Sequence, residues 1–285
     1  IRVAVNLWCK DSTKATAEYG RIEEWNTSEV TDMSSLFRKQ PDFNQDLSRW
    51  DVSKVTNMSN MFDGAISFNQ DIGEWKVSQV MNMSNMFDNA TSFNQVLNRW
   101  DVSNVLYMRS MFNGATSFNQ ALNGWNVSRV TKMCHMFQHT ISFNQDLNEW
   151  NVSRVANMSY MFGDAISFNR DIGGWDVSRV RDMSNMFYHA STFNQNLSRW
   201  NVSNVANMCQ MFSFATAFNQ DLSGWRVHNV SNMCDMFHGA SSFYQDLSGW
   251  DVGMCRIHGM FSHATTLRTS LQSKMQVHSF FEGVY

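Results

Sequence analysis

One tryptophan recurs every 25 residues through most of this chain, without a slip over ten copies. Because no insertion interrupts the series, each unit must follow the same path and return to an equivalent place. A strict period of this length is typical of stacked repeat proteins, in which a unit contacts only its neighbours. The sequence therefore predicts one solenoid of about ten rungs instead of two globular domains. The tryptophans are Trp25, Trp50, Trp75, Trp100, Trp125, Trp150, Trp175, Trp200, Trp225 and Trp250.

The spacing of apolar residues changes within each unit. Trp50 and Val52 alternate with polar residues, which is typical of a strand. From Val55 to Ala65 the apolar residues are spaced by three, three, one and three, which predicts a short helix. Helices are wider than strands, so a stack of such units should curve. We therefore expect an α/β, leucine-rich-repeat-like solenoid with a parallel sheet on its concave side and short helices on its convex side.

The tripeptide Phe-Asn-Gln is the most uniform part of the unit. An amide side chain both donates and accepts hydrogen bonds, so a row of asparagines can satisfy backbone groups that a turn leaves unpaired. We interpret the row as a structural asparagine ladder in preference to a ligand-binding row. Its members are Asn44, Asn69, Asn94, Asn119, Asn144, Asn169, Asn194 and Asn219.

Both ends of the chain depart from the repeat. Residues 1–22 are expected to form an N-terminal cap, residues 23–261 the repeat solenoid, and residues 262–285 a C-terminal cap. The unit that begins at Asp251 is one residue short. Caps are expected because an open stack would expose apolar ends.

Charge and composition argue against several function classes. The net charge is -3 and the Lys and Arg residues are scattered, whereas nucleic-acid binding normally needs a basic face. No apolar stretch is long enough to predict a transmembrane segment. The sequence contains neither a glycine-rich phosphate loop nor a G-x-S-x-G motif. We therefore expect no enzymatic activity, no catalytic residues, no cofactor and no nucleic-acid partner.

Two sets of residues invite a metal-site interpretation. Cys255, His258 and His263 lie near one another in sequence, but their spacing matches no familiar zinc pattern. Asp residues recur just after the tryptophans and calcium between them is conceivable, but Lys76 and Arg226 interrupt that row. We expect no metal site.

The five cysteines cannot all pair internally, because their number is odd. Cys134, Cys209 and Cys234 occupy the same repeat position, which is mostly Ser elsewhere. A small buried side chain that replaces Ser is the simpler interpretation. A disulfide between Cys209 and Cys234 stays open, since stacking brings equivalent residues of adjacent rungs together.

Polar residues next to the tryptophans should point away from the core, because side chains alternate along a strand. This places a polar row on the predicted concave face, where it would suit a protein or glycan partner. The candidate partner-binding residues are Arg49, Asp51, Lys76, Arg99, Asp101, Glu149, Arg199 and Arg226.

The unit also carries a specific resemblance. The segment from Leu47 to Val55 fits the leucine-rich repeat pattern L-x-x-L-x-L-x-x-N, with Trp in one Leu place and Val in the Asn place. From about Trp25 to Phe261, the chain follows the longer pattern W-D-V-S-x-V-x-N-M-S-x-M-F-x-x-A-x-x-F-N-Q-D-L. This pattern closely resembles the BspA-like leucine-rich repeat surface proteins, a family first described as a mycoplasma domain of unknown function. The resemblance implies a secreted or cell-surface protein with a role in adhesion or other protein–protein interaction.

Other functions remain open. The alternative to an interaction protein is a structural subunit of a larger assembly, such as a shell, filament or membrane-associated complex. A binder of ice or mineral is a weaker alternative, because charges interrupt the regular polar row. A glycan-cleaving β-helix is weaker still, given the helical spacing from Val55 to Ala65.

Overall fold

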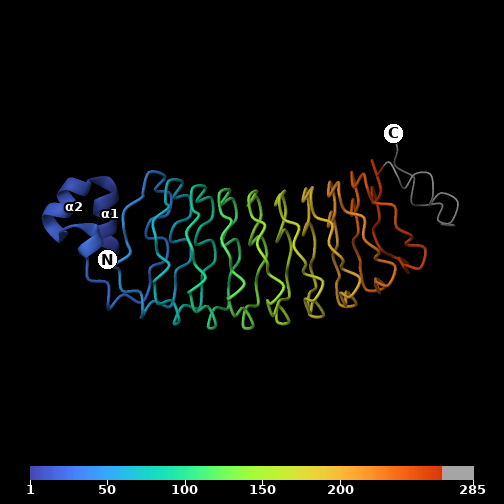
Figure 1. Cartoon of the computed structure of the whole chain (residues 1–285), viewed down its shortest axis with the longest axis horizontal. Coiled ribbons are helices and arrows are strands. Elements are labelled where there is room, and N and C mark those ends of the chain that lie inside the picture. Colours follow the sequence, from blue (N-terminus) through green and yellow to red (C-terminus); the bar gives the residue numbers. More distant parts are fainter. Residues whose placement is uncertain (265–285) are drawn as a thin grey trace.

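The computed structural model describes residues 1–264, which form one elongated stack of rungs behind a small helical unit (Figure 1). Helices α1 (Arg2–Lys10) and α2 (Ser12–Tyr19) and the short 3-10 helix η1 (Ile22–Glu24) precede the first rung. The predicted single solenoid is confirmed. The C-terminal cap predicted over 262–285 lies almost wholly outside the described residues.

One residue of each rung forms a parallel β-bridge with the equivalent residue of the next rung. The bridges begin with Asp32–Asn57 and recur at equivalent residues of each following rung. The last one joins Asn232 to Arg256, one residue less than the period, which confirms that the final unit is short. The strand predicted at Trp50 is wrong, because within residues 1–264 the parallel pairing occurs at these bridges instead.

The helix predicted from Val55 to Ala65 is also wrong. The segment consists of successive turns whose backbone amides alternate between two directions. Met61 N–H donates to the carbonyl of Met58 in its own rung at 3.2 Å, whereas Phe62 N–H donates to Met86 of the next rung at 2.9 Å. Half of the amides therefore close turns, and the other half tie the rungs together.

Left-handed residues explain why no helix forms there. Asn60 has φ 58° and Gly64 has φ 72°, and their equivalents recur in every rung. An α-helix does not accommodate a left-handed residue in each turn. Met58, Met61 and Phe62 point into the core from consecutive turns, and this reproduces the apolar spacing of a helix without its backbone.

The ring spacings in three columns of stacked aromatic residues show that neighbouring rungs diverge toward one side of the stack. Neighbouring rings in the column through Phe62 lie 5.5–5.8 Å apart, and those in the column through Phe68 lie 5.9–6.1 Å apart. The stacked tryptophans lie 6.3–6.4 Å apart, as between Trp75 and Trp100. Equivalent points are related by the same step from rung to rung, so the larger spacing marks the wider side of the stack. Figure 1 shows the rungs closer together along one long edge than along the other.

This geometry corrects the predicted curvature. The backbone-paired turns occupy the narrow side, where direct hydrogen bonds require rungs about 4.8 Å apart. The tryptophans occupy the wide side. The polar row beside the tryptophans is therefore convex, not concave.

Side chains bridge the rungs where the backbones are too far apart to pair. Trp150 Nε1 donates to the carbonyl of Leu122 at 3.0 Å, and the equivalent bond recurs from Trp50 to Trp250 at 2.8–3.1 Å. The indole therefore fills the core and also links neighbouring rungs by a hydrogen bond.

The asparagine row bridges rungs in the same manner. Asn219 N–H donates to Asn194 Oδ1 at 2.9 Å, and Gln220 Nε2 donates to the same oxygen at 2.9 Å. The backbone bond recurs from Asn69 onward, and Tyr244 still donates to Asn219 although it ends the row itself. Most of these asparagines are half-buried, while Asn44 and Asn69 are exposed.

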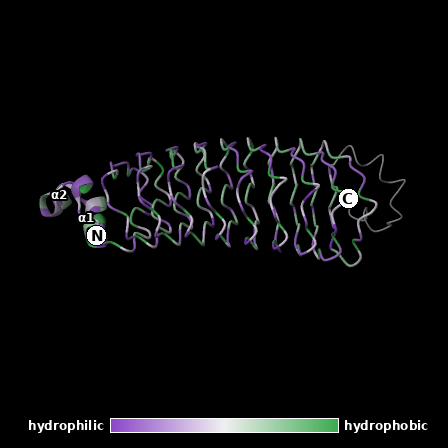
Figure 2. Ribbon diagram, turned by 60° about the horizontal axis from the view of Figure 1, so that its bottom comes forward, coloured by the Kyte–Doolittle hydropathy of each residue, from purple (hydrophilic) through white to green (hydrophobic). Residues whose placement is uncertain are grey.

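The core is a set of parallel columns of like residues. Two methionine columns, from Met58 to Met233 and from Met61 to Met236, are fully buried. The phenylalanine column from Phe62 to Phe237 is also fully buried. Hydrophobic and hydrophilic residues alternate around each rung (Figure 2). No rung can bury its own apolar side, so stability depends on contacts with both neighbours.

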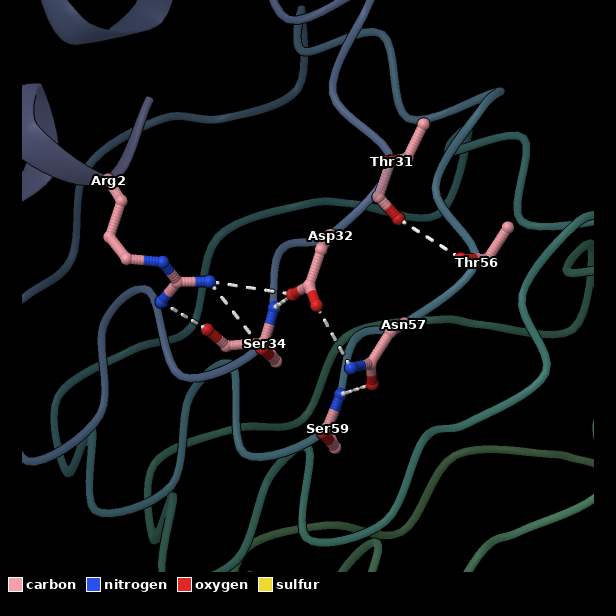
Figure 3. A network of polar contacts seen from close by, with 7 residues as sticks. All are labelled: Arg2, Thr31, Asp32, Ser34, Thr56, Asn57 and Ser59. Atoms are coloured by element: carbon pink, nitrogen blue, oxygen red, sulfur yellow. Dashed lines mark hydrogen bonds and ion pairs between the residues drawn. The ribbon is translucent and has the colours of Figure 1, made fainter.

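The helical unit docks onto the first rung. Trp8 of α1 meets Phe43 edge to face, with ring centroids 5.5 Å apart. Arg2 Nη1 donates to the carbonyl of Ser34 at 2.7 Å, and Arg2 Nη2 lies 3.4 Å from Asp32 Oδ1 (Figure 3). Asp32 Oδ2 in turn accepts from Asn57 Nδ2 of the next rung at 3.3 Å, so the cap is tied to two rungs.

Candidate functional site

The candidate residues beside the tryptophans form one exposed row, here called the charged row. Trp50, Trp75 and Trp100 are only 3–4% exposed, so the residues that flank them in sequence point outward. All eight members are exposed: Arg49, Asp51, Lys76, Arg99, Asp101, Glu149, Arg199 and Arg226.

Three members of the charged row come together on neighbouring rungs. Lys76, Arg99 and Asp101 line an open depression of about 370 Å³, together with Glu74 and Trp75. Arg99 forms an ion pair with Glu74 across the two rungs. Both side chains are largely exposed, so this pair orders the surface but contributes little to stability.

The two aspartates of the charged row have a structural role that the sequence did not reveal. Asp51 Oδ1 accepts from Ser53 N–H at 2.9 Å, and Asp101 Oδ1 accepts from Ser103 N–H at 3.1 Å. Hydrogen bonding from Ser53 lowers the pKa of Asp51. Asn offers the same acceptor, which explains why Asp and Asn interchange in this column.

The basic residues Lys76 and Arg226 share that repeat position but cannot accept this bond. The residues equivalent to Arg199 on the two adjacent rungs are Gly174 and Gly224. Neither glycine has a close neighbouring atom at the place where a side chain would begin, so the surface around Arg199 is open. Within residues 1–264, Glu149 and Arg199 form no ion pair. These charges are therefore available to a partner.

A second surface lies on the narrow side, over the backbone-paired turns. It consists of His and aromatic residues that stack between rungs, and we call it the histidine edge. Its members are His135, His139, Tyr160, Asp164, Tyr188, His189, Phe214, His238 and His263.

Asp164 is the centre of the histidine edge. Its Oδ2 lies 3.5 Å from His139 Nδ1, and its Oδ1 lies 3.6 Å from His189 Nδ1, so one carboxylate serves two imidazoles from the rungs on either side. His189 also packs against Tyr188 and edge-on to Phe214. Asp164 is 25 residues from each of the two histidines, which are themselves 50 residues apart. Only an alignment of the repeat units with one another would have shown that the three side chains lie together.

Neither surface offers a metal centre. In the part of the chain that the structure describes, no group of three or more His, Cys, Asp or Glu side chains converges well enough to hold a metal ion. All five cysteines are free thiols. None of the helices among residues 1–264 has the length and apolar character needed to cross a membrane.

Two stacked carboxylates lie at the other end of the narrow side. Asp63 accepts from Arg38 Nε at 2.7 Å, while Asp88 on the next rung accepts from Asn113 Nδ2 at 2.9 Å. Burial raises the pKa of Asp88 to about 6; the bond from Asn113 opposes that shift and the charge of Asp63 adds to it. Because the pKa is higher in the folded chain, folding favours the protonated form. That stabilisation is complete below about pH 4 and is lost as the pH rises through about 6.

We predict that Asp88→Asn stabilises the protein above pH 6 and not below pH 4. The carboxylate is partly exposed, so the gain at pH 7.5 should be about 1 kcal/mol, well under the full value that the pKa shift would give. Denaturant melts at pH 3.5, 5 and 7.5 measure it. Asp51→Asn, at a position where Asn occurs naturally, is the control, and an equal gain for the two variants at pH 7.5 would contradict the prediction.

The observed stack, with one parallel bridge per rung and no inserted loop from Trp25 to Trp250, defines a solenoid repeat protein. The family described as "Mycoplasma protein of unknown function, DUF285" matches residues 9–123, 95–191 and 167–274. These overlapping matches cover most of the chain, and the protein belongs to this family.

No curated protein matches the chain. Among solved structures, the chain is similar to one described as "Crystal structure of TLR13-ssRNA13 complex", with 10% sequence identity and a TM-score of 0.32. That match covers 84% of this chain but only 37% of the other one.

Proposed function

We propose that this protein is a non-catalytic interaction protein of the BspA-like leucine-rich repeat type, secreted or displayed at a cell surface. It binds a protein or glycan partner through the charged row. The observation that carries the proposal is the exposed charge of residues such as Arg199, which forms no ion pair within residues 1–264, on a regularly spaced surface.

The dimensions of the charged row suit such a role. From Lys76 to Arg226 the row crosses six rung steps of about 6.4 Å, or roughly 40 Å in all. A surface of that length can supply a specific interface, which typically buries about 1,200–2,000 Å² in total. Arg is enriched among the few residues that dominate binding energy, so Arg199 and Arg226 are the preferred anchors.

Reversing the charge of Lys76 and Arg199 together, to Glu, should weaken partner binding by at least tenfold without changing the thermal midpoint. Both side chains are exposed, so the fold should tolerate the change. Partners captured from the native source and identified by mass spectrometry, together with an array of neutral and anionic glycans, serve as the probes. The change in Kd is then measured by surface plasmon resonance.

The control carries the same change of charge elsewhere. Lys10→Glu combined with Lys14→Glu alters two exposed residues of the helical unit and should leave binding intact. If both double variants lose binding equally, net charge and not the charged row is responsible. If neither loses it and the partner instead protects the histidine edge around His139 and Tyr188, the function of a structural subunit in a larger assembly is favoured.

A further inference from the structure

Cys209 and Cys234 lie in register on adjacent rungs. Gln210 N–H donates to the carbonyl of Cys234 at 2.9 Å, so the peptide that follows Cys209 pairs with Cys234 itself. The two residues also have the same local backbone, since each amide donates at 3.1 Å to the side-chain oxygen of the asparagine two residues earlier. Their side chains therefore leave the backbone in parallel.

This position is on the narrow side of the solenoid, where backbone pairing holds rungs about 4.8 Å apart. A disulfide needs Cα atoms about 4.4–6.8 Å apart and Cβ atoms about 3.5–4.5 Å apart. A spacing of about 4.8 Å satisfies the Cα condition, and the Cβ atoms of parallel side chains must then approach by about 0.3–1.3 Å. Burial raises the pKa of Cys209 and Cys234 adds to that shift, which agrees with the register of the two residues.

We propose that Cys209 and Cys234 are a cross-rung disulfide site, open in the reduced protein and closed by a small-molecule disulfide such as oxidised glutathione. A thiolate of the pair attacks the oxidant, releases one glutathione thiol and forms a mixed disulfide. The second cysteine then displaces the other glutathione. The two cysteines lose two electrons, the oxidant gains them, and two glutathione thiols leave. The proposal is independent of partner binding.

The chain contains its own control for this reaction. Cys134 occupies the same repeat position, but its neighbours in the column are Arg109 and Ser159. It shares the repeat position and its equivalents on the adjacent rungs are not cysteines, although Lys132 stands where Cys209 and Cys234 have an asparagine two residues earlier. Ser occupies this position in most rungs, so Cys→Ser variants at 134, 209 and 234 should all fold.

Cys255 is the one competitor that the geometry suggests. Cys234 contributes to the raised pKa of Cys255, although burial is the larger cause. Cys255 replaces a core valine and is not in the column of Cys209 and Cys234. The experiment must therefore distinguish a 209–234 link from a 234–255 or 209–255 link.

Tryptic mapping of the oxidised full chain makes that distinction. Cleavage after Arg199, Arg226 and Arg256 places Cys209 in peptide 200–226 and both Cys234 and Cys255 in peptide 227–256. After equilibration with oxidised glutathione and alkylation, we expect these two peptides to be joined. The link should persist in Cys255→Ser, vanish in Cys234→Ser, and leave Cys134 alkylated or glutathionylated but never cross-linked.

A thermal melt provides the second measurement. Closing the link should raise the thermal midpoint of the wild type and of Cys134→Ser by a few degrees, and should leave Cys209→Ser unchanged. The proposal is overturned if peptides 200–226 and 227–256 stay separate in the Cys255→Ser variant. It is equally overturned if Cys209 and Cys234 only acquire glutathione, as Cys134 does.

Discussion

Replacing Phe137 with alanine should destabilise the protein by about 3–5 kcal/mol, the largest effect expected of any single change considered. Phe137 is fully buried, and its ring lies 5.7 Å from Phe112 on one rung and 5.7 Å from Phe162 on the next. Phe143 of its own rung is closer still, at 4.2 Å. The truncation leaves a cavity in the core. The surrounding rings are already packed against the equivalent rings of their own neighbours, so they cannot move to fill it.

Guanidinium denaturation measures this cost. Phe214→Ala is the matched control, since Phe214 is the same residue type but is 37% exposed at the histidine edge. It should cost well under half as much. Equal costs at the two positions would mean that stability does not come from the continuous phenylalanine columns.

Asn194→Ala should destabilise the protein by about 1–3 kcal/mol. It removes the oxygen that accepts both the backbone N–H of Asn219 and the side-chain amide of Gln220, each at 2.9 Å. The backbone carbonyl of Asn194 also accepts from Gln220 Nε2, at 3.1 Å, so the variant chiefly leaves the N–H of Asn219 without its acceptor. Thermal and denaturant melts report the loss.

Asn194→Asp separates the hydrogen bonds from the shape of the side chain. A carboxylate accepts from both donors, so this variant should retain most of the stability at pH 7 and lose it on protonation at low pH. If alanine is tolerated as well as aspartate at neutral pH, water satisfies the two donors and the asparagine row does not hold the rungs together.

The period of the tryptophans predicted the solenoid, the register and the short last unit. It could not predict the backbone inside a rung, because inward residues such as Met58, Met61 and Phe62 have the same spacing in a helix and in a run of turns. Asn60 and Gly64 carried the missing signal. Both residue types favour positive φ, but the equivalent positions of other rungs hold residues such as Tyr160 and Phe214, so the signal is present in only some copies of the unit.

The candidate surfaces were predicted unevenly for a related reason. The exposed row beside the tryptophans follows from alternation of side chains, but its convex position depends on the fanning of the rungs. The histidine edge was missed because Asp164 meets His139 and His189 only across rungs. The turn-capping role of Asp51 was missed because it depends on a local bond to Ser53.

The cross-rung hydrogen bonds at the turns also give this row of peptide groups a direction. Asn57, Ser59, Met61 and Asp63 all direct their carbonyls toward the preceding rung. At these turns the end of the stack beside α1 therefore presents carbonyls, although Thr56 and Ile66 direct theirs the opposite way, to Met81 and Ser92 of the next rung. Arg2 places its charge at that end, against the carbonyl of Ser34. A second molecule could extend this ladder of backbone hydrogen bonds only if the two stacks met head to tail. The helical unit covers the edge of the first rung at which that molecule would have to pair.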